Sequence, residues 1–303
     1  MPCYKPLNAW RTTVKTSKGK KAIAFKKSAT TTTPLNLPCG SCIGCKLDRS
    51  LMWAIRCVHE SQLYDENAFL TLTYNSENLP WDGSLIKSHI QKFIRKLRKH
   101  YPTKTIRYYM CGEYGENLSR PHYHICLFGM TFPDREIYKE NEGILLYQSK
   151  TLESLWGKGF CTLGDLTFET AAYTARYILK KINGDQQYDH YQTTCVHTGN
   201  LINLEPEYTT MSRKPGIGLN WVRKYSTDIW PHDFLVHNNA TVKVPRYYDN
   251  QLTEEALIQI KKTRITNAKK QAKNNTPERL AVREKIKLLN LKQLTRSYEN
   301  YDT

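Results

Sequence analysis

The chain has 303 residues, and its hydrophobic content of 40% is enough to build a core, which excludes disorder throughout. Lysine and arginine outnumber aspartate and glutamate by 45 to 28, giving a formal net charge of +17 at pH 7. This charge is expected of a protein that binds a phosphate backbone, although a merely basic soluble protein would also carry it. No run approaches the roughly 18 apolar residues of a membrane span, and no signal-peptide core is present, which disfavours membrane insertion and secretion.

The first 63 residues divide into an arm and a helix. Residues 1–38 are basic and rich in threonine and lysine, with short apolar stretches, so we expect an extended arm with one or two short strands. From Lys46 to about Leu63 the apolar residues recur at helical spacing, which predicts a helix.

The central part of the chain alternates between strand and helix patterns. Residues 69–74 alternate large apolar residues with threonines, as a half-buried strand does. An amphipathic basic helix is predicted from Ile86 until Pro102 stops it. Residues 106–114 and 121–128 are strand-like and separated by a loop of hairpin length, so we expect them to pair antiparallel.

Later segments continue the mixed pattern. A strand near residues 160–166 precedes a helix from about 168 to 182, which Asn183 and Gly184 would terminate. Thr253 and Thr276 have the chemistry of residues that begin helices, and two charged helices are expected after them. These helices fit either an appendage for DNA binding or oligomerisation, or plain solvated helices.

Strands and helices mix without strict alternation, and the central hairpin requires antiparallel pairing. The predicted fold class is therefore α+β, with helices packed on an antiparallel sheet. We expect three regions: a basic N-terminal arm with a cysteine cluster and a helix over residues 1–62, a catalytic domain over 63–230, and a basic helical C-terminal extension over 231–303.

Two imidazoles define the first candidate site. His122 and His124 lie two residues apart on a predicted strand and therefore project from the same face. The hairpin would bring the carboxylate of Glu113 close to both of them. Two imidazoles and one carboxylate suit Mg²⁺, Mn²⁺ or a similar ion with positions left open for phosphate oxygen. Taken alone, a His-x-His pair is weak evidence, because a structural pair would look the same.

The predicted helix over 168–182 carries the second candidate group. Tyr173, Tyr177 and Lys180 share one face, which is expected to lie opposite the core-packing side. The predicted buried stripe consists of Ala171, Ala175, Ile178 and Ile182. Tyrosines that fill a second packing surface are the alternative, but they would not explain why the lysine joins them.

A metal ion beside a tyrosine suggests phosphodiester chemistry. A phenol has a pKa of about 10 and needs a cation to polarise the phosphodiester and stabilise the developing charge. Attack on phosphorus would give a 5′-phosphotyrosine and a free 3′-hydroxyl, which conserves the bond for rejoining. A second tyrosine one turn away would then cut again while the first still holds DNA.

The cysteines indicate a third candidate site. Nine cysteines are present, and Cys39, Cys42 and Cys45 are spaced to wrap one soft metal ion, with Cys3 or Cys57 as the candidate fourth ligand. Structural Zn²⁺ is favoured over unligated thiols, and over an iron–sulfur cluster, for which the usual following Cys-Pro is missing. The remaining cysteines fit small core residues: Cys111, Cys126, Cys161 and Cys195.

With these residues in view, the sequence resembles the HUH endonucleases, named for a His-hydrophobe-His pair. Within them it is most similar to the replication initiators of gokushovirus-type microviruses, which are small single-stranded DNA phages. The matching segments appear in family order. They are residues 38–45, 69–74, 112–115, 120–124, 127–129, 173–177, 179–181 and 211–218.

The resemblance implies roles for the candidate residues and a ferredoxin-like or RRM-like sheet. His122 and His124 would be metal ligands with Glu113 as the third, and the paired tyrosines would alternate as nucleophiles at the replication origin, with Lys180 assisting at phosphate. Tyr123 between the histidines is a mild departure from a plain aliphatic residue. Basic residues are expected to contact DNA: Arg120, Arg176, Lys181, Arg213 and Lys214.

The resemblance also implies partners and a location. Single-stranded DNA at the origin is the expected substrate, in the cytoplasm of an infected bacterial host. The chain has no Gly-x-x-x-x-Gly-Lys-Ser/Thr loop, so it would rely on a host helicase, together with a host DNA polymerase.

Alternative functions stay open. A plasmid initiator, a conjugative relaxase or a single-strand transposase would use the same chemistry, but the paired tyrosines and the cysteine motif favour the phage initiator. A zinc-stabilised, non-catalytic nucleic-acid-binding protein would explain the charge and the cysteines. Such a protein has no need of a helix face bearing two tyrosines and a lysine.

Overall fold

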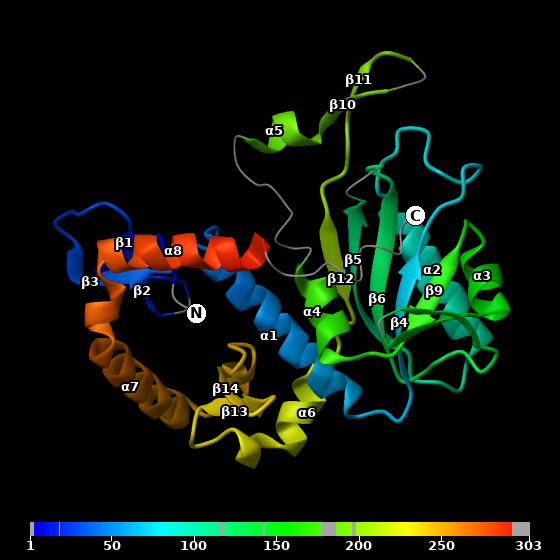
Figure 1. Cartoon of the computed structure of the whole chain (residues 1–303). Coiled ribbons are helices and arrows are strands. Elements are labelled where there is room, and N and C mark those ends of the chain that lie inside the picture. Colours follow the sequence, from blue (N-terminus) through cyan, green and yellow to red (C-terminus); the bar gives the residue numbers. More distant parts are fainter. Residues whose placement is uncertain are drawn as a thin grey trace. The chain divides into compact units, whose positions relative to one another are not determined.

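In a computed structural model of the chain, the described residues are 3–17, 19–115, 118–141, 143–176, 186–195 and 198–292 (Figure 1). The chain divides into two compact units, one formed by Met1–Arg49 with Lys261–Thr303 and the other by Ser50–Ile260. The domain boundaries that the sequence predicts at residues 62 and 230 remain a prediction. None of the helices in these ranges is long and apolar enough to cross a membrane.

The unit that contains the N-terminus is built on a small antiparallel sheet. Strand β1 (Leu7–Lys15) lies between β2 (Lys21–Ala24) and β3 (Thr31–Leu37). The arm expected here has more regular structure than predicted, because its threonine-rich segments pair with one another across the sheet.

Two C-terminal helices belong largely to the same unit. They are α7 (Glu254–Lys270) and α8 (Pro277–Lys292), and they begin directly after Thr253 and Thr276 as predicted. The threonine hydroxyls accept hydrogen bonds from backbone N–H groups of the first turns, at 3.3 Å and 3.4 Å. Leu280 of α8 is buried against Tyr4 and Cys42, so this helix covers the cysteine loop.

The larger unit contains a seven-stranded antiparallel sheet with the order β12-β5-β6-β4-β9-β8-β7. Four adjacent strands, in the order β5-β6-β4-β9, together with helices α2 and α3, form a β-α-β-β-α-β unit of the ferredoxin-like type. The predicted α+β class is therefore confirmed. The strands are β4 (Asn67–Leu72), β5 (Arg107–Tyr114), β6 (Pro121–Phe128), β7 (Glu136–Asn141), β8 (Ile144–Gln148), β9 (Cys161–Gly164) and β12 (Tyr208–Met211).

Helices cover both faces of this sheet (Figure 1). Side chains alternate along β6, so Tyr123, Ile125 and Leu127 pack with α2 (Lys87–His100) and α3 (Lys150–Trp156). Cys126 and Phe128 face the other way and pack with α1 (Ile43–Ser61) and α4 (Phe168–Arg176). The candidate imidazoles of His122 and His124 belong to this second face.

The remaining elements were not predicted, because they are short and carry weak periodicity. Helix α3 and the β7–β8 hairpin follow β6, and smaller elements follow α4. The latter are α5 (Gln186–Tyr191), β10 (Gln192–Thr194), β11 (Leu201–Asn203), α6 (Leu219–Lys224), β13 (Phe234–His237), β14 (Ala240–Lys243) and the 3-10 helices at Ser226–Asp228, Tyr248–Gln251 and Ala272–Asn275.

A buried ion pair anchors the loop between β12 and α6. The Arg107 guanidinium pairs with the carboxylate of Glu60 and donates to the carbonyl of Pro215 at 2.8 Å. The same carboxylate accepts the N–H of Gly218 at 2.6 Å. Gly218 has φ +77°, and a Cβ at this position would lie 2.5 Å from the Tyr248 hydroxyl. This glycine is therefore required by backbone conformation and by close packing.

We expect Gly218→Ala to lower the free energy of unfolding by about 3 kcal/mol, because strain at positive φ and overpacking add. Gly83→Ala is the matched control: Gly83 also has positive φ, but a Cβ added there would meet nothing within 4 Å. The control should cost only about 1 kcal/mol. Urea unfolding of both variants measures the difference, and equal losses would show that the contact with Tyr248 is unimportant.

Candidate metal centre and active site

Three buried side chains meet on the face of the sheet that also carries Cys126 and Phe128. His122 Nε2 and His124 Nε2 lie 2.8 Å and 2.9 Å from the same atom, Oε1 of Glu113. The register of the β5–β6 hairpin produces this meeting, since Glu113 lies directly opposite His122. The three ligand atoms lie within 4.8 Å of one another, and the group is able to hold a metal ion.

The second nitrogen of each imidazole has a partner that orients the ring. The carbonyl of Arg120 accepts a hydrogen bond from His122 Nδ1 at 3.2 Å, and His124 Nδ1 lies 3.0 Å from Thr71 Oγ1. Such outer contacts fix which nitrogen is available to a metal. Here they leave both Nε2 atoms directed at Glu113.

The proton count at His122 favours a cation at this site. A neutral imidazole carries one N–H, yet His122 faces an oxygen acceptor on each of its nitrogens. Two protons on the ring, or a metal ion in place of the Nε2 proton, would satisfy both contacts. The donor set of two imidazole nitrogens and a carboxylate oxygen fits a divalent ion.

Glu113 provides a fixed negative charge in a buried position, since only 1% of its surface is exposed. Burial raises the pKa of a carboxyl group, but the hydrogen bonds from His122 and His124 outweigh this effect and lower the pKa of Glu113 to about 2. The carboxylate is therefore ionised at neutral pH and stabilises positive charge between the imidazoles.

Tyr173 contacts one of the two imidazoles. Its ring centroid is 5.0 Å from that of His124 and 6.2 Å from that of Phe69, both in edge-to-face geometry. Phe69 in turn stacks on His124 at 5.6 Å. An aromatic ring thus links helix α4 to the imidazole pair.

The prediction that Tyr173 lies on a helix face away from the core is wrong. Tyr173 is 5% exposed, while Ala171 and Ala175 are fully buried as predicted. Both sides of α4 are covered, because the sheet lies on one side and α1 on the other, where Ala54 and Cys57 pack with the alanines. The tyrosine therefore faces the imidazoles from inside the fold.

Several of the predicted residues lie outside the described part of the chain, and two predicted arginines are not among the candidate ligands. Tyr177, Lys180 and Lys181 are outside the described residues, as are Ile178 and Ile182. Arg176 is the last described residue of α4 and is half-buried. Arg120 donates a hydrogen bond from its side chain to the Tyr74 carbonyl at 2.9 Å, beside the site.

Tyr123, the residue between the two histidines, belongs to the opposite face of the sheet. It is fully buried, and its hydroxyl lies 2.9 Å from that of Tyr74 and accepts the N–H of Ile86 at 3.0 Å. Its replacement of an aliphatic residue therefore changes the core and leaves the metal ligands untouched.

The other unit contains a group of four cysteines. The sulfur atoms of Cys3, Cys39, Cys42 and Cys45 lie within 4.8 Å of one another, with Cys3 Sγ 3.6 Å from Cys39 Sγ and 3.8 Å from Cys42 Sγ. Four sulfurs at about 2.3 Å from a tetrahedral zinc ion would be separated by about 3.8 Å. This group is able to hold a metal ion, and Cys3 is its fourth member.

Backbone N–H groups point at these sulfurs. The N–H groups of Tyr4 and Cys42 lie 3.3 Å and 3.2 Å from Cys42 Sγ and Cys39 Sγ. Burial raises the pKa of Cys39, but hydrogen bonds from Cys42 and Ser41 outweigh it and lower the pKa to about 6. A thiolate is the form that binds metal, so Cys39 is favoured as a ligand, whereas burial raises the pKa of Cys3 and raises that of Cys45 to about 12.

Cys57, the other candidate fourth ligand, is excluded from the group. It is fully buried in the larger unit among Ala54, Tyr109 and Cys126. The helical position of Cys57 on α1 explains why, since it faces the sheet. The cysteines predicted as core residues are all buried, as expected: Cys111, Cys126, Cys161 and Cys195.

A family model and individual relatives both identify similar proteins of one kind, the replication-associated proteins. The family model described as "Replication-associated protein ORF2/G2P" matches residues 67–182, which include the three candidate ligands and Tyr173. A replication-associated protein of Spiroplasma virus 4 is 36% identical over 233 residues, covering 73% of this chain and 68% of the relative.

The chain belongs to this family of phage replication-associated proteins.

Further relatives extend the family match. A replication-associated protein of Bdellovibrio phage phiMH2K is 31% identical, covering 82% of this chain and 76% of the relative. One of Chlamydia phage 1 is 28% identical, covering 71% of this chain and 53% of the relative. No solved structure matches. The resemblance to microvirus replication initiators that the motifs indicated is confirmed.

Two residues that contact a candidate metal ligand were missed from the sequence. Thr71 and Phe69 both contact His124 from β4, where they lie on the same face of the strand. The alternation in residues 69–74 showed that they share a face. Only the pairing of β4 with β6, more than 50 residues away in the sequence, shows that this face lies beside His124.

We expect Thr71→Val to weaken Mn²⁺ binding by roughly 10-fold, because the outer contact that orients His124 is lost while its shape is kept. Thr73→Val is the matched control, since the Thr73 hydroxyl donates to the Phe160 carbonyl and not to a ligand. Isothermal titration calorimetry measures both affinities. Wild-type affinity in Thr71→Val would show that Thr71 does not orient the ligand.

Proposed function

We propose that the protein is a replication initiator endonuclease that nicks single-stranded DNA at a phage origin through metal-assisted tyrosine attack. The observation that carries the proposal is the Tyr173 ring, 5.0 Å from that of His124 in a buried group of three metal ligands. A nucleophile and a Lewis-acid site so close together suit phosphodiester transfer.

In this proposal Glu113, His122 and His124 would hold Mg²⁺ or Mn²⁺, which would supply Lewis-acid stabilisation of charge on the phosphate oxygens. The Tyr173 hydroxyl attacks phosphorus. A bond forms between the phenol oxygen and phosphorus, and the bond from phosphorus to the 3′-oxygen breaks. The phenol loses its proton and the departing 3′-oxygen gains one, leaving a 5′-phosphotyrosine and a free 3′-hydroxyl. The reverse transfer rejoins the strand and releases a circle.

Tyr173 is proposed as one nucleophile, because its ring centroid lies 5.0 Å from that of His124. Tyr177 lies one helical turn on in the sequence and is proposed as the second nucleophile, with Lys180 assisting at phosphate. This pair would let one tyrosine cut while the other still holds DNA.

The substrate proposal rests on charge and family. A net charge of +17 favours a polyanion, and membership of a replication-associated family points to DNA. Arg120, Arg176, Lys181, Arg213 and Lys214 are proposed DNA contacts. A host helicase and a host DNA polymerase are proposed partners, in the cytoplasm of the infected bacterium.

We further propose that Cys3, Cys39, Cys42 and Cys45 bind structural Zn²⁺. The separations of the sulfurs fit tetrahedral ligation, and the loop is covered by Leu280 of α8. A bound ion would join the N-terminal segment, the cysteine loop and the start of α1, which otherwise share few apolar side chains.

Formation of a covalent protein–DNA product tests the nuclease. Labelled single-stranded oligonucleotides that tile the replicon encoding the chain are incubated with the protein and Mn²⁺, then run on a denaturing gel. We expect one oligonucleotide to give a protein-linked band with the wild type and with Tyr177→Phe. We expect none with the Tyr173→Phe/Tyr177→Phe double variant or with a chelator.

Tyr138→Phe is the matched control, because Tyr138 is exposed on β7 and has no place in the metal centre. It should give the wild-type band. A band that survives the double change would move the nucleophile elsewhere. Specific binding of the oligonucleotide without any band, in the presence of Mn²⁺, would favour the non-catalytic binding protein.

Metal content tests the zinc proposal. We expect the purified protein to contain about one zinc per chain by mass spectrometry, and Cys42→Ser to contain almost none, since a thiolate ligand is lost. Cys161→Ser, which alters a buried cysteine of the larger unit, should keep its zinc. Iron with a visible absorption band would point to an iron–sulfur cluster, and a metal-free protein insensitive to chelator would leave the thiols unligated.

A further inference from the structure

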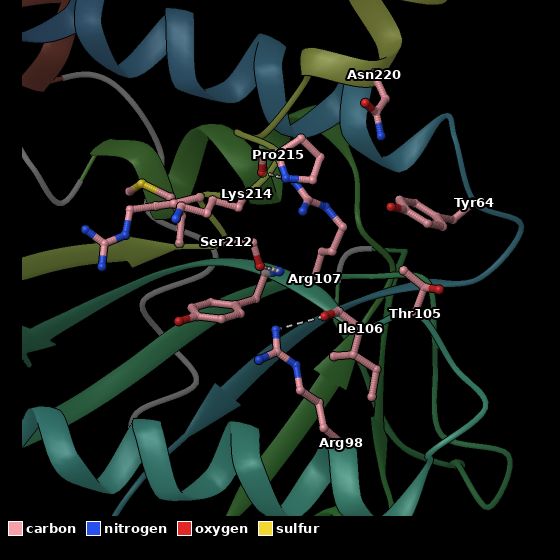
Figure 2. Close-up of a pocket in the computed structure, with 12 residues that line it drawn as sticks. Tyr64, Arg98, Thr105, Ile106, Arg107, Ser212, Lys214, Pro215 and Asn220 are labelled. Carbon is pink, nitrogen blue, oxygen red and sulfur yellow. Dashed lines mark hydrogen bonds between the residues drawn. The ribbon is translucent and has the colours of Figure 1, made fainter.

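A pocket of about 500 Å³ lies at the end of β5 opposite to the metal centre (Figure 2). It is formed by the first residues of β5, the loop that follows β12 and the last turns of α2. Figure 2 shows Arg98 approaching from α2 and Lys214 from the loop, on different sides of Arg107. The metal centre uses none of its lining residues.

The pocket is strongly basic. Arg98, Arg107, Arg213 and Lys214 line it, and none of its twelve lining residues is acidic. Arg107 is paired with Glu60. In the ranges that the structure covers, no carboxylate forms an ion pair with any of the other three cations. Three positive side chains therefore line one cavity, where an anion would be stabilised, although Arg98 also donates a hydrogen bond to the Ile106 carbonyl at 3.0 Å.

The loop that carries Arg213 and Lys214 is held in place at both ends. At its start, the backbone of Ser212 donates to the Tyr108 carbonyl at 3.0 Å, and the Ser212 hydroxyl accepts the Tyr108 N–H at 3.2 Å. At its end, the Arg107–Glu60 pair binds the carbonyl of Pro215 and the N–H of Gly218. Because the loop is already ordered, an anion would bind without the cost of ordering it.

The remaining lining groups suit a nucleotide better than a bare phosphate. Tyr64 and Tyr108 are half-buried aromatic residues, and Asn220 contributes an exposed amide. Aromatic side chains stack on nucleobases of any sequence, and amides pair with base edges. The volume also lies in the range of pockets that hold small organic ligands.

We propose that this pocket binds one nucleotide unit of the DNA strand, with its phosphate held by Arg98, Arg213 and Lys214. The inference rests on the proposed function only in taking DNA as the substrate. Arg107 and Glu113 lie six residues apart on β5, which places the pocket about 20 Å from the metal centre. A strand bound at both places would span the distance with about six nucleotides on a straight path at duplex spacing. The pocket would thus set the register of the strand before it is cut.

The test measures binding of a fluorescent 15-residue oligothymidylate to the full chain by anisotropy, with chelator present so that no cleavage occurs. Arg213 and Lys214 would contact the same phosphate, so removing both charges should lower the slope of log affinity against log salt by about 0.7, or roughly 5-fold at 0.1 M salt. We expect this loss in Arg213→Gln/Lys214→Gln, whose altered side chains are exposed and so leave the core intact.

Lys92→Gln/Lys150→Gln is the charge-matched control, since both lysines are exposed and neither lines the pocket. It should lose less than about 3-fold. Equal losses in the two double variants would overturn the proposal, because only overall charge would then matter. Deoxythymidine monophosphate is the second probe. The wild type could bind this free nucleotide tightly, and the Arg213→Gln/Lys214→Gln variant could lose that binding while keeping its affinity for oligothymidylate. This result would overturn the assignment of the pocket to the DNA strand.

Failure of this inference is distinguishable from failure of the proposed nuclease. Oligothymidylate binding through the pocket would persist in a protein that never forms a covalent product. Conversely, the Arg213→Gln/Lys214→Gln variant could keep its DNA affinity and still form the covalent product at saturating DNA. The nuclease proposal would then stand, and the pocket proposal would be wrong.

Discussion

The larger unit depends on one shared atom, the Oε1 of Glu113, which lies between the Nε2 atoms of His122 and His124. A buried carboxylate is costly unless positive charge or strong donors compensate it. Both imidazoles supply that compensation from the neighbouring strand, and their outer nitrogens are held by the Arg120 carbonyl and Thr71. The arrangement is able to hold a metal ion, because these contacts set the orientation of both rings.

Two small residues on helix α4 allow Tyr173 to lie close to His124. Ala171 and Ala175 let α4 pack closely between the sheet and α1, so that Tyr173 on the same helix meets His124. At the far end of β5, the Arg107–Glu60 pair orders a basic loop in a comparable way. One strand thus connects the candidate metal centre with the basic pocket, the two places that we propose hold a nucleic-acid strand in a defined register.

Local patterns predicted much of this arrangement. Alternation and a short turn were enough to bring Glu113 to the two histidines, because hairpin register is a local property. The face of Tyr173 was wrongly predicted, since helical periodicity shows which residues share a face but not that α4 is covered on two sides. Thr71 and the basic pocket require the pairing of β4 with β6 and of β12 with β5. No single-segment pattern contains such long-range pairing.

The central claim is that a divalent ion binds between the sheet imidazoles beneath Tyr173. Anomalous diffraction from a crystal containing Mn²⁺ tests it most directly. The account predicts a manganese peak at bonding distance from Nε2 of His122, Nε2 of His124 and a carboxylate oxygen of Glu113, with the Tyr173 hydroxyl on the open side of the ion. A crystal saturated with Mn²⁺ that shows no peak at these three atoms would contradict it.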